Sequence, residues 1–325
     1  MVSSSQGESR WHGRSDPDGA ADGPPMVRGF RWSWGGERHR LRLTIPLWLL
    51  QYYRSRPRGS QYGVYVVDPF DRDLLGGIAA HVDRFASRND LDDRQRVDFA
   101  ASLVQQLEYV RDDYSAPTDR YPRYPVETLV NRGGDCKDSS ILVAALLGAL
   151  GYDVVFLRQP RHLQVGVALE DEYPGTYYEY AGDRYYVLET TNPSWTVGDL
   201  PSEYEDESVR FEQATGVPVV VHRWTALSGD QPGRVGGTFH VTNLGDGVAN
   251  RVDAYVRFET ETGRTVGRRD HHFCDISPGE TRSWDFECAL SGDTPVRGSV
   301  SLSLDSLPHD ESASAYLRPE SAQKS

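Results

Sequence analysis

The chain has 325 residues, of which 38% are hydrophobic, and a formal net charge of −13 at pH 7. This length can bury more than one hydrophobic core, and the composition is that of a globular protein with a solvated acidic surface. The acidic balance argues against nucleic acid as the main partner, because binding to phosphates needs clustered positive charge.

The N-terminal segment, residues 1–26, is rich in Ser, Gly, Asp and Pro and contains no hydrophobic run. We therefore expect a disordered tail there, without a signal peptide. The first longer apolar run, Leu43 to Tyr53, is too short to span a bilayer. These features predict a cytoplasmic protein with reduced thiols and no membrane contact. Met26 directly precedes the first structured segment, so both Met1 and Met26 stay open as the start of the protein.

Lysine is nearly absent, since Lys137 and Lys324 are the only lysines among 35 basic residues. An acidic surface with arginine in place of lysine indicates a halophilic host, in which carboxylates keep the protein hydrated at high salt. A GC-rich genome is the alternative explanation, because it also favours arginine.

Residues 27–94 are expected to form an N-terminal extension packed on the core that follows. Strand-like pieces come first, and helical periodicity then extends over residues 74–111, with a break near 87–90. Spacings of four, four and three residues mark one apolar face of the second helix: Phe99, Leu103, Leu107 and Val110.

A cysteine stands at the start of the next predicted helix. The segment Arg132-Gly133-Gly134-Asp135-Cys136 precedes a long apolar run, and Asp135 is expected to cap the helix. Helix N-termini carry unpaired N–H groups and a partial positive charge, so they favour the thiolate, which is the nucleophilic form of cysteine. Cys136 is therefore the candidate nucleophile, and a packed small hydrophobic residue is the alternative.

A thiol nucleophile needs a base, and the base needs a group that orients it. His162 opens an alternating strand, on which Gln164 shares its face. A hairpin over residues 177–189 ends in Glu189. If these strands are antiparallel neighbours, opposed Cβ atoms lie roughly 4.5–5.5 Å apart, so the carboxylate can hold the imidazole. An ordinary strand histidine and a surface carboxylate are the alternatives.

Roughly residues 95–205 resemble the transglutaminase-like superfamily of papain-like thiol enzymes, microbial members included. The resemblance rests on Gly-Gly-Asp-Cys before an apolar helix, on a histidine that opens a strand, and on an aromatic strand that ends in an acid and Thr-Thr. It implies that Cys136 is the nucleophile, His162 the base and acid, and Glu189 the orienting acid. The family more often has Asp at Glu189, and an aromatic residue shortly after the histidine where this chain has Leu163-Gln164.

The resemblance implies an α+β catalytic core over residues 95–210, with the cysteine-bearing helix packed on an antiparallel sheet. It implies a cysteine peptidase or amidase that acts on a peptide or glutamine-type amide through a thioester, without a cofactor. Amine transfer, deglycosylation of a glycosylated asparagine, and a non-catalytic interaction scaffold remain as alternatives.

Residues 217–306 contain short alternating strands separated by Gly, Asn and Pro turns, which predict an immunoglobulin-like β-sandwich that could bind a protein partner. A disordered tail is expected over residues 307–325. The run Asp270 to Asp275 holds metal-ligand residue types, but strand alternation would split them between two faces, so no metal is expected. Cys274 and Cys288 are expected to be free thiols.

Overall fold

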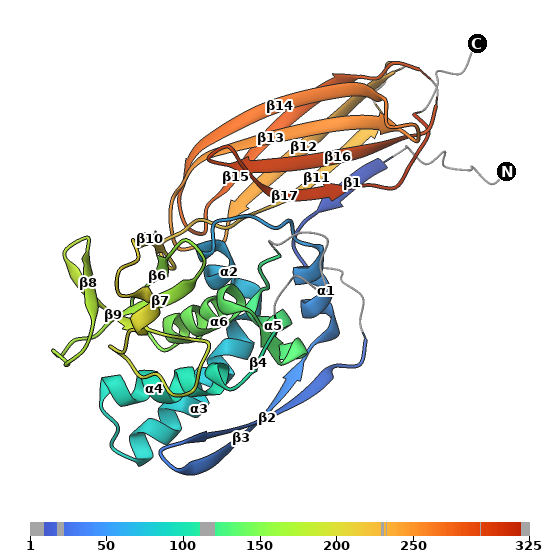
Figure 1. Cartoon of the computed structure of the whole chain (residues 1–325). Coiled ribbons are helices and arrows are strands. Elements are labelled where there is room, and N and C mark those ends of the chain that lie inside the picture. The colour runs from blue at the N-terminus through green and yellow to red at the C-terminus, as the bar shows by residue number, and fades with distance from the viewer. Residues whose placement is uncertain are drawn as a thin grey trace. The chain divides into compact units, whose positions relative to one another are not determined.

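The computed structural model describes residues 10–17, 23–110, 121–228, 231, 233–292 and 294–319. The chain divides into two compact units (Figure 1). We call Gly19–Val217 the helical unit, and Met1–Asp18 together with Pro218–Ser325 the strand unit. The fold is α+β with mostly antiparallel sheets, as the sequence predicts. The narrower assignments, a papain-like core and an immunoglobulin-like sandwich, stay predictions.

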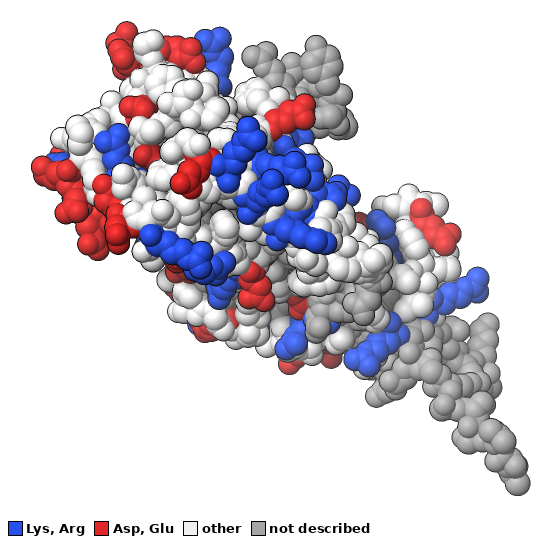
Figure 2. Space-filling model, turned by 90° about the horizontal axis from the view of Figure 1, so that it is seen from below, with Lys and Arg blue, Asp and Glu red and all other residues white. Residues whose placement is uncertain are grey.

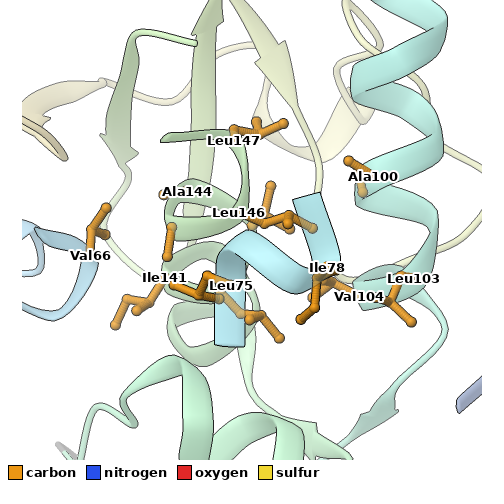
Figure 3. Close-up of a cluster of buried hydrophobic side chains, with 14 of the residues drawn as sticks. Val66, Leu75, Ile78, Ala100, Leu103, Val104, Ile141, Ala144, Leu146 and Leu147 are labelled. Carbon is orange, nitrogen blue, oxygen red and sulfur yellow. The ribbon is translucent and has the colours of Figure 1, made fainter. Parts of the chain in front are cut away.

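The helical unit is built around one buried helix, α6 (Cys136–Ala149). The other helices of this unit are α1 (Leu47–Ser55), α2 (Gly63–Val67), α3 (Arg72–Arg88), α4 (Asp93–Gln105) and α5 (Pro125–Asn131). Helix α6 is apolar around most of its circumference, which is typical of a helix that neighbours enclose on all sides. Figure 3 shows its side chains among those of α2, α3 and α4.

The predicted break between two helices near residues 87–90 is confirmed, because α3 ends at Arg88 and α4 begins at Asp93. Asp92 explains where α4 begins. Its side chain accepts a hydrogen bond from the Gln95 backbone N–H, and the Gln95 side chain accepts one in return from the Asp92 N–H. This capping box satisfies two backbone donors that a helix start leaves unpaired.

A five-stranded antiparallel sheet packs beside α6 in the strand order β10-β6-β7-β9-β8. Its strands are β6 (Val154–Arg158), β7 (Leu163–Ala168), β8 (Tyr177–Tyr180), β9 (Asp183–Leu188) and β10 (Arg210–Gln213). The strand that follows His162, β7, and the strand that precedes Glu189, β9, are antiparallel neighbours. Strands β8 and β9 form the predicted hairpin.

The first hairpin belongs to the same core. Strands β2 (Met26–Trp34) and β3 (Glu37–Ile45) pair antiparallel, and their inward side chains join the hydrophobic cluster that also contains α4 and α6. Residues 27–94 and 95–210 therefore share one core.

The double glycine before α6 allows close packing. Gly133 and Gly134 form β5, which pairs in parallel with β4 (Glu108–Tyr109). A Cβ on Gly133 would lie 2.5 Å from the Glu108 carbonyl oxygen, and one on Gly134 would lie 2.5 Å from the Asp138 Cβ. Both distances are too short for real side chains, so glycine is required here for close approach to its neighbours.

The strand unit consists of two four-stranded antiparallel sheets that share one hydrophobic core. The sheet orders are β1-β11-β12-β15 and β14-β13-β16-β17. The strands are β1 (Arg10–Arg14), β11 (Val220–Ser228), β12 (Arg234–Asn243), β13 (Ala249–Thr260), β14 (Thr265–Ile276), β15 (Thr281–Ala289), β16 (Val296–Leu304) and β17 (Leu307–Ala313).

Each of the two segments expected to be a disordered tail contains a strand in the structure. Arg10–Arg14, placed in a tail over residues 1–26, form β1 and bury Trp11 completely in the strand-unit core. Leu307–Ala313, placed in a tail over residues 307–325, pair with β16. Each strand is stabilised by pairing with distant residues, which short local patterns do not reveal. The remaining tail predictions at 1–9, 18–22 and 320–325 lie outside the described residues.

Among the described residues, no helix has the length and apolar character needed to cross a membrane.

Candidate active site

Cys136 is the first residue of α6, and its neighbours define the helix start. The Asp135 carboxylate accepts hydrogen bonds from the backbone N–H groups of Lys137 (3.0 Å) and Asp138 (3.2 Å). This confirms the predicted capping role of Asp135. The thiol therefore stands at the N-terminal, positive end of a buried helix.

The structure brings His162 and Glu189 together at one end of two neighbouring inner strands of the five-stranded sheet. His162 directly precedes β7, and Glu189 directly follows β9, the strand paired with β7. The His162 Nε2 and the Glu189 Oε2 are 2.7 Å apart, and the two side chains are 8% and 2% exposed. Glu189 occupies Nε2, which leaves Nδ1 as the ring nitrogen available to a thiol, and Cys136 is close enough to raise the pKa of His162.

Glu189 is held by hydrogen bonds to both of its carboxylate oxygens. Oε2 accepts from His162 and from the Gln164 side-chain amide at 3.0 Å. Oε1 accepts from the backbone N–H groups of Thr190 (3.0 Å) and Thr191 (2.9 Å) and from the Thr191 hydroxyl (2.6 Å). Together these hydrogen bonds fix the carboxylate in one orientation and favour its ionised form.

Two further polar contacts fasten the elements that carry these residues. The Ser140 hydroxyl on α6 donates to the Leu163 carbonyl oxygen at 2.8 Å and lies 3.0 Å from the Thr190 hydroxyl. The Gln105 side-chain amide on α4 donates to the Glu189 carbonyl oxygen at 2.8 Å. Cys136, His162 and Glu189 are thus positioned by rigid elements, and their spacing depends on buried hydrogen bonds.

The pKa values of the pair are shifted in opposite directions. Burial lowers the pKa of His162, but its hydrogen bonds to Cys136 and Glu189 outweigh burial and raise that pKa to about 9. Burial raises the pKa of Glu189, but its bonds to His162, Thr191 and Gln164 outweigh burial and lower it to about 2. Near neutral pH the pair is therefore an imidazolium beside a carboxylate, and an imidazolium next to a thiol stabilises the thiolate.

An aromatic ring covers His162 from a distant part of the chain. Tyr204, in the 3₁₀ turn Ser202–Tyr204, stacks on the imidazole with ring centroids 4.4 Å apart and an interplanar angle of 5°. Burial, Glu203, Glu189 and Cys136 all raise the pKa of Tyr204, so its hydroxyl stays protonated at neutral pH. No sequence pattern indicates this role of Tyr204, because its acidic segment has no periodicity.

The charged residues of the first turn of α6 form ion pairs. Asp138 is fully buried, and its carboxylate accepts from the Arg123 guanidinium at 2.7 Å and from the Arg123 backbone N–H at 2.9 Å. Burial and the nearby Asp135 raise the pKa of Asp138 to about 6, and the Arg123 and Lys137 cations partly offset them. Lys137 forms an ion pair with Asp135. These side chains support the helix start beside the thiol.

A second arrangement of serine, histidine and acid lies in the strand unit. His222 Nδ1 is 2.8 Å from the Asp310 carboxylate, and His222 Nε2 is 2.7 Å from the Ser312 hydroxyl. The hydroxyl also accepts from the Trp224 indole, and a Cβ on Gly13 would lie 2.8 Å from it. His222 and Asp310 are buried, so close packing leaves no room for a substrate and the cluster joins β11 to β17.

Cys274 and Cys288 are free, as expected, with Cys274 exposed and Cys288 buried. Within the described part of the chain, no group of three or more His, Cys, Asp or Glu side chains is placed to hold a metal ion.

No protein-family model matches this chain, and no curated protein matches its sequence. Among solved structures, the chain is similar to calcium-bound LapG of Legionella pneumophila, with 18% sequence identity and a TM-score of 0.31. The match covers 44% of this chain and 74% of that protein. A TM-score this low supports no conclusion about this chain. Its chemistry is therefore inferred from the arrangement of Cys136, His162 and Glu189 alone.

Proposed function

We propose that this chain is a transglutaminase-like thiol hydrolase that cleaves a peptide or glutamine-type amide. Cys136 is the nucleophile, His162 is the base and acid, and Glu189 orients the imidazole. The observation that carries the proposal is the 2.7 Å contact between His162 Nε2 and the buried Glu189 carboxylate, beside a cysteine at a helix N-terminus that also raises the pKa of His162.

In the proposed reaction, the Cys136 thiolate attacks the carbonyl carbon of the amide. The Cys136 backbone N–H helps to hold the oxyanion, at a helix N-terminus that favours negative charge. The His162 imidazolium gives its proton to the leaving amine, so the C–N bond breaks and a thioester remains. Neutral His162 then removes a proton from water, which attacks the thioester and releases the acid and the thiolate.

Mass spectrometry of a trapped acyl-enzyme tests the proposal directly. Brief incubation with the p-nitrophenyl ester of an N-acetylated glutamine is expected to add one acyl group at Cys136 and to release it on standing. The Cys136→Ser variant should lose this adduct, and the Cys274→Ser variant should keep it. Added putrescine distinguishes water from an amine as acceptor, because only amine transfer yields the putrescine amide. Acylation without preference for Cys136 would contradict the hydrolase and favour the scaffold alternative.

The His162 pKa is expected to fall by about one unit or more in Glu189→Gln, because the neutral amide no longer stabilises the imidazolium. NMR titration of the His162 ring measures this pKa. The proposed reaction needs protonated His162, so activity should decline as the pH rises through the pKa of about 9, and at a lower pH in the variant.

Thr191→Val is the matched control, because it removes one hydrogen bond to Glu189 and leaves the charge. Its His162 pKa should stay close to that of the wild type. Equal pKa values for His162 in wild type and Glu189→Gln would show that the carboxylate does not act on the imidazole.

A further inference from the structure

The outer face of the β2–β3 hairpin is strongly basic, although the protein as a whole is acidic. The segment Met26–Ile45 contains five arginines and a single acidic residue, Glu37. Strand alternation turns four of these arginines outward, and all four are exposed: Arg31, Arg38, Arg40 and Arg42. Figure 2 shows blue side chains gathered on the lower face of the molecule, where Figure 1 places the hairpin.

This arginine face is rigid and uncovered. The opposite side of the hairpin is buried in the core through aromatic and aliphatic side chains, including Trp32 and Leu43. Backbone atoms of Ser33 also exchange two hydrogen bonds with the side chain of Gln106, which directly follows α4. On the outer side, a Cβ placed at Gly29, opposite Arg42, would meet nothing within 4 Å. The guanidinium groups are thus presented to solvent on a fixed backbone.

The arrangement of the arginines costs stability within the hairpin. Arg31 and Arg40 are directly opposed across the two strands, and like charges in this position repel each other. Within the described ranges, none of the four outward arginines is in an ion pair, in contrast to Arg123 beside α6. A bound anion would remove the repulsion, because guanidinium groups form paired hydrogen bonds with carboxylates.

The spacing of the arginines fits an extended chain. Arg38, Arg40 and Arg42 occupy alternate positions of β3, so their Cα atoms repeat about every 6.7 Å. Carboxylates at alternate positions of an extended peptide have the same repeat. Nucleic acid fits less well, because the aromatic side chains of the hairpin all point to the other face and leave no platform for base stacking.

We infer that the outer face of the β2–β3 hairpin, with Arg31, Arg38, Arg40 and Arg42, is a docking surface for an extended acidic segment of a partner protein, with carboxylates at alternate positions. This surface does not use Cys136 and is independent of the proposed hydrolase.

Fluorescence anisotropy with a labelled peptide of five Glu-Thr repeats tests the inference on the full chain at low salt. We expect saturable binding that weakens as salt is added. Replacement of Arg38, Arg40 and Arg42 by Gln should weaken binding about tenfold, because three charge pairs are lost. These side chains are exposed, so the melting temperature should stay close to that of the wild type.

A variant with Arg223, Arg264 and Arg269 replaced by Gln is the charge-matched control, because these exposed arginines lie on other strands or turns. It should bind the peptide within about twofold of the wild type. A peptide with five glutamates followed by five threonines should bind more weakly than the alternating one. Equal loss in both variants, or equal binding of both peptides, would overturn the inference. Tighter binding of single-stranded DNA or of phosphatidylserine vesicles through the same arginines would also overturn it.

Discussion

Iodoacetamide is expected to alkylate Cys136 at pH 6 about 100-fold faster in the wild type than in His162→Ala. An isolated thiol with a pKa of about 8.5 is almost entirely protonated at pH 6, and the protonated form does not react. Burial disfavours the charged form of His162, but Cys136 and Glu189 stabilise that form and outweigh burial. His162 therefore supplies a positive charge beside the sulfur. Removal of the imidazole takes away this charge, so the rate should fall and rise again only at alkaline pH. Peptide mass spectrometry gives the rate at each cysteine.

Cys274 provides an internal control for this experiment, because it is exposed and free and lies on β14 of the strand unit. Its rate should not respond to His162→Ala. Because Cys136 is only partly exposed, accessibility alone would make it the slower of the two. If Cys136 reacts more slowly than Cys274 at pH 6, and the His162 substitution has no effect, the thiol is not activated and the scaffold alternative is favoured.

The contacts of His162 and Glu189 could be predicted because each residue lies at the end of a short, regular element. Strand alternation predicted that His162 and Gln164 share one face. The hairpin with a glycine-containing turn predicted that Glu189 lies at the same end of the sheet as His162. In the structure, Gln164 and His162 both bond the Glu189 carboxylate. Local pattern was sufficient here, because neighbouring strands constrain one another through register.

The support for this site could not be predicted in the same way. The family often has an aromatic residue shortly after the histidine, where this chain has Leu163-Gln164, and the ring that covers His162 comes instead from Tyr204, in a segment without periodicity. Position in the first turn of the helix also gives no sign that Asp138 is fully buried against Arg123. Both contacts depend on where distant segments meet, and that is set by tertiary packing.

The buried pair of Arg123 and Asp138 gives the second large effect. Asp138→Ala is expected to lower the free energy of unfolding by about 3–4 kcal/mol, since removal of one partner of a buried ion pair leaves the other charge poorly solvated. It would also remove an acceptor from the Arg123 backbone N–H and from the Asp135 N–H at the start of α6. Urea denaturation, followed by circular dichroism, measures the change.

Asp83→Ala is the matched control, because Asp83 forms an ion pair with Arg96 at 2.6 Å but is 48% exposed. An exposed pair contributes about 1 kcal/mol or less, so the two variants should differ although they remove the same chemical group at nearly the same distance. The comparison isolates burial as the cause. It also connects stability to chemistry, because Asp138 supports the helix start that carries Cys136. If both substitutions lower the free energy of unfolding by the same small amount, the first turn of α6 is solvated. The thiol of Cys136 then does not lie in the buried, charged environment described for it.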